Sequence, residues 1–123
     1  MTRARSVLLI VATALTACSS HRKGAVQSRD EFSLVVVNHH WLDVAVYVVH
    51  DGQRTRVGTV TATSTQQFDL SSRLLGSTRQ VSLIGEAVGS REVVSTEMLS
   101  VQPGQYIEWT LENALRRSSV AVY

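Results

Sequence analysis

The side chains best suited to bind a metal ion lie in two short segments of the 123-residue chain. They are two adjacent histidines, a histidine beside an Asp-Gly pair, and the aspartates nearest to them: His39, His40, His50, Asp43 and Asp51. A zinc site needs three or four ligands in a fixed geometry, and adjacent histidines can rarely both point at one ion. We therefore expect no metal and no cofactor. Instead we expect a solvated loop in which Trp41 closes one end of the domain.

Tyr47, Arg54 and Arg56 form a second group, because a predicted hairpin brings them together. Asp51-Gly52 separates two alternating runs, 43–50 and 53–60, which is a strong signal for a two-residue type I′ turn. That register pairs Tyr47 with Arg56 and places all three side chains on the outward face. The opposite, core-facing side carries the apolar and threonine positions Val44, Val46, Val48, Thr55, Val57 and Thr59.

Two interpretations of this outward group remain open. An arginine over a tyrosine ring is a common stabilising pair at exposed sites, so the group can be purely structural. Aromatic residues and arginine are also enriched at protein interfaces, so Tyr47, Arg54 and Arg56 are a candidate protein-contact face for a protein, a glycan or an acidic polymer.

The sequence contains none of the usual catalytic patterns. There is no Gly-x-Ser-x-Gly elbow, and Glu97 and Glu108 alternate with apolar neighbours, as on the solvent face of a strand. Gly85 and Gly89 lack the strand-to-helix context of a phosphate-binding loop. We therefore expect no catalytic residues and no enzyme.

From Phe32 onward the chain consists of short β-type runs separated by turn signals. We expect seven strands, at 32–37, 43–50, 53–60, 66–70, 79–84, 92–101 and 105–111, with one capped helical turn over 71–76 and a loop over 85–90. A tight hairpin at Gln102-Pro103-Gly104-Gln105 would put the apolar sides of its two strands on opposite faces, so this connection must cross between sheets. The pattern predicts an all-β, seven-stranded antiparallel sandwich, with 113–123 as either a frayed tail or an edge strand.

Residues 32–111 resemble the small immunoglobulin-like domains of bacterial envelope lipoproteins. The resemblance lies in Val44-x-Val46-Tyr47-Val48, Gly52-x-Arg54-x-Arg56-Val57-Gly58-x-Val60 and Pro103-Gly104-Gln105-x-x-x-Trp109. It implies an immunoglobulin-like fold and transfers no activity.

The first residues have the form of a signal peptide. Arg3 and Arg5 precede an apolar run, 7–15, that is shorter than the ~20 residues of a membrane-spanning helix. Leu15-Thr16-Ala17-Cys18 resembles the lipobox of bacterial lipoproteins, which implies diacylglyceryl attachment to Cys18, cleavage before it and further acylation of the new amino terminus. The alternative is an ordinary signal peptide whose cleavage leaves an unmodified Cys18, the sole cysteine of the chain.

The expected organisation is a signal peptide (1–17), a lipidated polar tether (18–31), a β-sandwich domain (32–112) and a C-terminal tail or edge strand (113–123). Ser19 favours the outer membrane, because the lipoprotein family's usual inner-membrane retention signal is Asp at that position. Cleavage lowers the basic count from 12 to 10, against 10 acidic residues, so we expect no nucleic-acid partner.

The sequence therefore predicts a lipid-anchored envelope lipoprotein with a non-catalytic binding or structural module. Its partners would be the membrane, through the lipid, and an envelope protein or glycan; its oligomeric state stays open. One alternative is an accessory or chaperone-like subunit that pairs through a strand edge, for which Leu34-Val35-Val36-Val37 is the candidate. A remote alternative is a small hydrolase, which would need a histidine beside a serine or carboxylate in a pocket.

Overall fold

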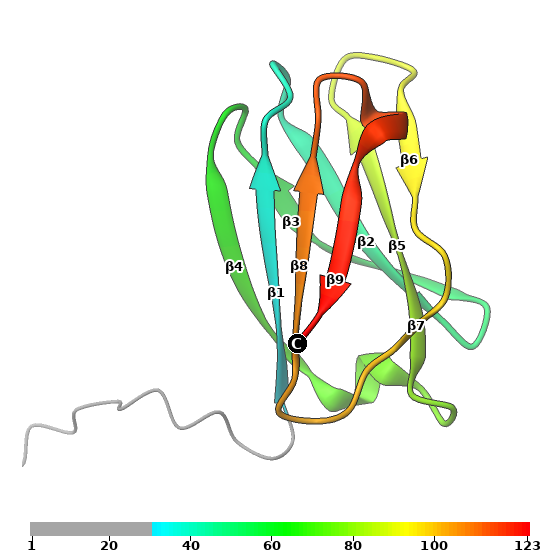
Figure 1. Ribbon diagram of the computed structural model, residues 1–123. Coiled ribbons are helices and arrows are strands. Elements are labelled where there is room, and N and C mark those ends of the chain that lie inside the picture. The colour runs from blue at the N-terminus through cyan, green and yellow to red at the C-terminus, as the bar shows by residue number, and fades with distance from the viewer. Residues whose placement is uncertain (1–30) are drawn as a thin grey trace, which may run out of the picture.

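The computed structural model describes residues 31–123, which form an all-β domain of two sheets (Figure 1). Its elements in chain order are β1 (Glu31–Asn38), β2 (Val44–His50), β3 (Gln53–Val60), β4 (Thr65–Ser71), the 3₁₀ turn η1 (Ser72–Leu75), β5 (Gln80–Ala87), β6 (Val93–Ser95), β7 (Leu99–Ser100), β8 (Tyr106–Leu111), the 3₁₀ turn η2 (Leu115–Arg117) and β9 (Ser119–Val122).

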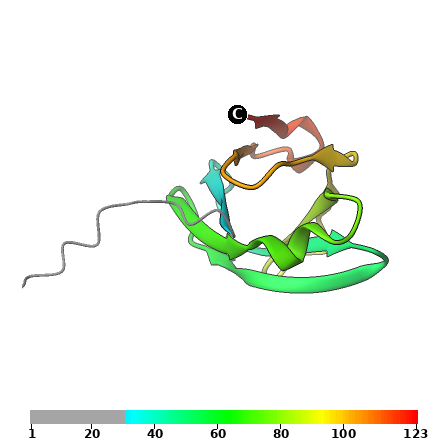
Figure 2. The ribbon, with the colours of Figure 1, turned by 90° about the horizontal axis from the view of Figure 1, so that it is seen from below.

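One sheet has the order β4-β1-β8-β9, and the other has β3-β2-β5-β6 with β7 also beside β5. Figure 2 looks along the strands and shows the β2–β3 hairpin on one side of the domain and the end of β9 on the other. The expected count of seven strands differs from the nine among the described residues. The run predicted as one strand at 92–101 is interrupted at 96–98. There the Thr96 hydroxyl accepts a hydrogen bond from the Leu83 amide, in place of a backbone carbonyl of a neighbouring strand. The C-terminal segment adds a further strand, β9, at the edge of the sheet that contains β1.

β1 lies in the middle of its sheet, between β4 and β8. Its pairing with β8 is parallel, with Leu34 opposite Ile107 and Val36 opposite Trp109. The expectation of a fully antiparallel sandwich is therefore wrong at this pair. No short turn joins the two strands, so chain connectivity does not set their relative direction. The proposed edge position of Leu34-Val35-Val36-Val37 is wrong as well, because these residues are paired on both sides.

The β2–β3 hairpin turns as predicted at its tip and slips by one residue farther in. Asp51 and Gly52 both have positive φ, 47° and 74°, as a type I′ turn requires. Pairing follows the predicted register as far as Tyr47 opposite Arg56, and then a bulge at Val57 places Val46 opposite Gly58. A bulge shifts which side chains face inward, so the buried residue near the end of β3 is Val60 rather than Thr59.

The core between the sheets is apolar and closely packed. Its largest fully buried side chains are those of Trp109, Phe32, Leu34, Leu75, Leu83, Ile107 and Leu111. A Cβ added at Gly85 would lie 3.0 Å from Trp109 Cη2 and 3.1 Å from Val44 Cγ1. Gly85 is therefore the point at which β5 passes beneath the Trp109 indole. The expectation of a loop from residue 85 is wrong, because β5 continues to Ala87.

Two further local predictions are confirmed. The connection at 102–105 crosses between sheets, since β7 pairs with β5 and β8 pairs with β1. The helical turn forms at Ser72–Leu75, where the Ser71 side chain accepts from the Arg73 amide and Gly76 follows the last residue.

Within residues 31–123 no helix has both the length and the apolar character needed to cross a membrane. Cys18, the lipobox and all but the last residue of the predicted tether lie outside the described residues.

Candidate functional site

The connections at one end of the sandwich meet around a buried asparagine. These are the loops after β1, between β3 and β4, between β5 and β6, and after β8, at the top of Figure 1. Asn38 is 1% exposed, and its side-chain amide donates to the carbonyls of Leu42, Val60 and Thr61 at 3.1–3.3 Å. Its Oδ1 accepts from the backbone N–H of His40 at 2.9 Å. Buried polar groups are stable only when paired, so Asn38 fixes the course of the following loop.

His40, and not Trp41, fills this end of the domain. The His40 side chain has no exposed surface, whereas Trp41 is 67% exposed with its ring stacked on His40 at a centroid distance of 5.8 Å. The expected solvated histidine loop closed by Trp41 is therefore wrong. The hydrogen bonds from the Asn38 side chain to the backbone of this loop turn His40 inward, and both ring nitrogens of His40 find partners there.

The hydrogen bonds of His40 define its tautomer. Nδ1 accepts from the backbone N–H of Leu42 at 3.0 Å, so the ring proton is on Nε2. Nε2 then donates to Oε2 of Glu92 at 3.1 Å. The carboxylate of Glu92 is half exposed, and it is held in position by a fully buried ring.

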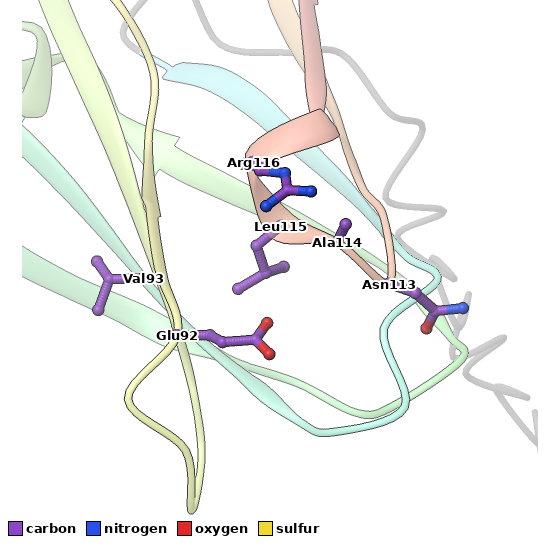
Figure 3. Close-up of a pocket in the computed structure, with 6 residues that line it drawn as sticks. All are labelled: Glu92, Val93, Asn113, Ala114, Leu115 and Arg116. Carbon is purple, nitrogen blue, oxygen red and sulfur yellow. The ribbon is translucent and has the colours of Figure 1, made fainter.

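Glu92 also lines a cavity of about 420 Å³ (Figure 3). The walls are the start of β6 on one side and the β8–β9 connection with η2 on the other; the lining residues are Glu92, Val93, Asn113, Ala114, Leu115 and Arg116. Figure 3 shows the carboxylate of Glu92 turned toward the 113–116 segment, with Arg116 on the far side of Leu115. The cavity thus carries opposite charges on opposite walls.

The two charges are separate within the described part of the chain. Arg116 makes no side-chain hydrogen bond or ion pair with any of residues 31–123, and Glu92 pairs there only with His40. None of the six lining residues carries a hydroxyl or a thiol. The cavity can therefore hold a charged ligand, and its walls supply no hydroxyl or thiol nucleophile.

The other two histidines near the predicted site lie apart from this cavity. His39 points outward and contacts Glu112 at 3.4 Å. His50 ends β2; its Nδ1 is buried without a hydrogen-bond partner and lies 3.7 Å from Asp51, whose carboxylate accepts from the Ser77 amide. Across residues 31–123, no three His, Cys, Asp or Glu side chains are grouped so as to hold a metal ion.

The predicted outward face of the hairpin contains one residue that the sequence did not suggest. The guanidinium of Arg54 lies 3.8 Å from the centroid of the Tyr47 ring and forms an ion pair with Glu86 of β5. The Glu86 hydrogen bond is the main cause of a raised pKa of Arg54. Arg56 instead donates to the Thr59 hydroxyl at 2.7 Å. Tyr47, Arg54 and Arg56 do share a surface, but the charge of Arg54 is already paired.

Sequence reasoning missed Glu92 and Arg116 as site residues. The sequence pattern places Glu92 at the start of a strand and Arg116 in the C-terminal tail, 24 positions away. The only signal for the arrangement was the Asn38-His39-His40 triplet. Periodicity predicts neither the burial of His40 nor its hydrogen bond to Glu92, 52 residues away.

Comparisons with known proteins add little. No protein-family model and no curated protein matches the sequence. A solved structure described as "NMR structure of the protein from Eubacterium rectale" is 17% identical; the match covers 81% of this chain and 93% of that chain, with a TM-score of 0.45. At this level the similarity indicates neither a family nor a function.

Proposed function

We propose that the chain is a lipid-anchored lipoprotein of the bacterial cell envelope, whose immunoglobulin-like β-sandwich is a non-catalytic binding module. The observation that carries the proposal is Leu15-Thr16-Ala17-Cys18 at the end of a basic and then apolar leader. Two or more acyl chains at Cys18 would anchor the protein stably, since each buried CH₂ contributes about 0.8 kcal/mol.

The arrangement of the domain is compatible with such an anchor. β1 begins at Glu31, at the end of the sandwich opposite the loops that carry Trp41 and the cavity (Figure 1). A tether attached at Glu31 would therefore present those loops away from the bilayer. Both ring nitrogens of His40 are hydrogen-bonded and no lining residue carries a hydroxyl or thiol for a histidine to activate, which favours binding over hydrolysis.

Membrane fractionation of cells that express the full chain tests this proposal. The wild type should sediment with membranes, resist extraction by salt and be released by detergent. Cys18→Ser cannot be acylated, so it should be released from the membrane fraction without detergent. Ser20→Ala is the matched control beside the anchor and should behave as wild type. Equal fractionation of wild type and Cys18→Ser would contradict the proposal. Ser19→Asp should move the protein from the outer to the inner membrane.

A second candidate function is strand-edge pairing through β9, in place of the β1 edge that the fold excludes. Tyr106 and Tyr123 exchange both backbone hydrogen bonds, at 3.1 and 2.9 Å. Because such pairs alternate along an antiparallel ladder, the N–H and C=O groups of Val120 and Val122 point to the open side of the sheet. β9 contains no lysine or proline, the residues that commonly protect an edge.

A proline scan separates this function from the first. Val122→Pro removes the valine side chain together with one outward N–H. Val122→Ala shortens the same side chain and keeps that N–H. If β9 pairs with an extended segment of another envelope protein, crosslinking in intact cells should lose that product in Val122→Pro and keep it in Val122→Ala. Retention of the product in both variants would contradict pairing at this edge.

A further inference from the structure

We infer that the cavity between β6 and η2 binds a small zwitterion, of the class of a free dipeptide with short aliphatic side chains. The inference rests on the proposed function as a binding module and adds a site and a ligand class to it. Its basis is the presence of two opposite charges on the walls of one cavity: the positioned carboxylate of Glu92 on one wall and the unpaired guanidinium of Arg116 on the other.

The carboxylate of Glu92 is held in place before any ligand arrives. Its Oε2 accepts from His40 Nε2, and the ring of His40 is in turn fixed by the Leu42 amide. The Glu92 backbone is bound on both sides, since its N–H donates to the Ser90 hydroxyl and its carbonyl accepts from the Ala87 amide. An ammonium group would therefore meet a carboxylate whose conformational freedom is already reduced, which favours binding. His40 is a positioning residue, because its complete burial keeps it from touching the ligand.

The opposite wall offers a donor for a carboxylate. The exposed guanidinium of Arg116 has no partner among residues 31–123, and a guanidinium can bind a carboxylate through two parallel hydrogen bonds. Glu92 and Arg116 form no ion pair with each other, so neither charge has to be released before a ligand binds. A ligand with a single charge would form an ion pair with only one of these two side chains.

The space between the charges suits a short aliphatic compound. Leu115 and Ala114 line the cavity between the two charged groups, and Val93 is 58% exposed beside it. A volume of about 420 Å³ lies in the range of small-ligand sites. Alanyl-alanine has the required ammonium, carboxylate and methyl groups, and it is the probe that we choose.

Amide NMR titration of the full chain in detergent tests the inference directly. Alanyl-alanine should produce saturable shifts at 92–93 and 113–116, and Glu92→Gln and Arg116→Gln should each weaken binding by about tenfold or more. Arg73→Gln is the matched control, because it removes the same charge at η1, at the other end of the sandwich, and should leave the affinity unchanged.

Blocked dipeptides separate the contribution of each charge. N-acetyl-alanyl-alanine lacks the ammonium, and alanyl-alanine amide lacks the carboxylate; each should bind at least about tenfold more weakly than the zwitterion. Equal binding of the blocked and free dipeptides, unchanged affinity in both cavity variants, or no saturable shift would overturn the inference. Those results would leave the lipid anchor untouched, because fractionation of Cys18→Ser is independent of this site.

Discussion

His40, which has no exposed surface, donates Nε2–H to the carboxylate of Glu92 across 3.1 Å. This single contact joins the loop after β1 to the start of β6, two segments that meet at the end of the sandwich farthest from Glu31. It also connects the core to the cavity, since one partner is buried and the other lines the cavity wall.

Replacement of His40 should therefore destabilise the domain. His40→Ala leaves a cavity and removes the partner of the Leu42 amide, and we expect a loss of about 2–4 kcal/mol in the free energy of unfolding. His39→Ala is the matched control, because His39 is exposed and should change stability by no more than about 0.5 kcal/mol. Urea unfolding monitored by tryptophan fluorescence measures both. Equal losses would show that His40 has no special structural role.

The close approach of Trp109 to Gly85 predicts an unusual effect of a small substitution. Alanine is normally better than glycine inside a strand, but Gly85→Ala places a methyl group 3.0 Å from the indole. We expect destabilisation by about 1–3 kcal/mol from overpacking. Trp109→Phe frees space at this contact, so it should lower the free energy of unfolding by less in the Gly85→Ala background than in the wild type. A double-mutant cycle by urea unfolding measures the coupling, and strictly additive losses would contradict the proposed contact.

Asp69 predicts how stability depends on pH. Hydrogen bonds from Gln67 and then Ser33 hold the pKa of Asp69 below its ordinary value of 3.8. A carboxylate with a lowered folded-state pKa stabilises the domain above its unfolded-state pKa and loses that contribution as the pH falls through the folded-state value. The stability difference between wild type and Asp69→Asn should thus be present at pH 7 and shrink below pH 3.8.

Titration by NMR gives an independent measure of the same effect. In Gln67→Ala the pKa of Asp69 should rise toward its ordinary value, because the largest cause of its shift is removed. A pKa that stays unchanged in this variant, or a stability difference that is constant with pH, would contradict the assignment.

The face formed by Tyr47, Arg54 and Arg56 predicts a contact that can be lost selectively. If it binds an envelope protein or glycan, the triple variant Tyr47→Ala/Arg54→Ala/Arg56→Ala should lose one crosslinked product in intact cells. Arg73→Ala/Arg91→Ala removes arginines elsewhere on the surface and should keep that product. Identical products from the triple variant and the wild type would assign the Tyr47–Arg54–Glu86 cluster a structural role only.

Local signals in the sequence predicted local structure well. Four confirmed features depend on residues close together in the chain: the Asp51-Gly52 turn, the shared outward face of Tyr47 and Arg54, the Ser71 cap and the crossing at 102–105. The bulge at Val57 was missed because Thr55, Val57 and Thr59 still alternate, and only the pairing partner reveals the slip.

Features set by distant partners were beyond prediction. The parallel pairing of β1 with β8 joins residues 73 positions apart, and no turn signal accompanies it. Polarity favoured Trp41 over His40 as the buried residue. The order is reversed because Asn38 pairs with the backbone N–H of His40, while Leu42 and Glu92 pair with its two ring nitrogens. The buried His40 positions the Glu92 carboxylate on the cavity wall, so periodicity alone could not locate this site.

The most direct test of the account is the intact mass of the protein purified from membranes. We predict a chain that begins at Cys18, with a diacylglyceryl group on Sγ and an acyl group on the new amino terminus. A chain that begins at Cys18 with an unmodified thiol, or one that keeps residues 1–17, would contradict the lipid anchor on which the proposed function rests.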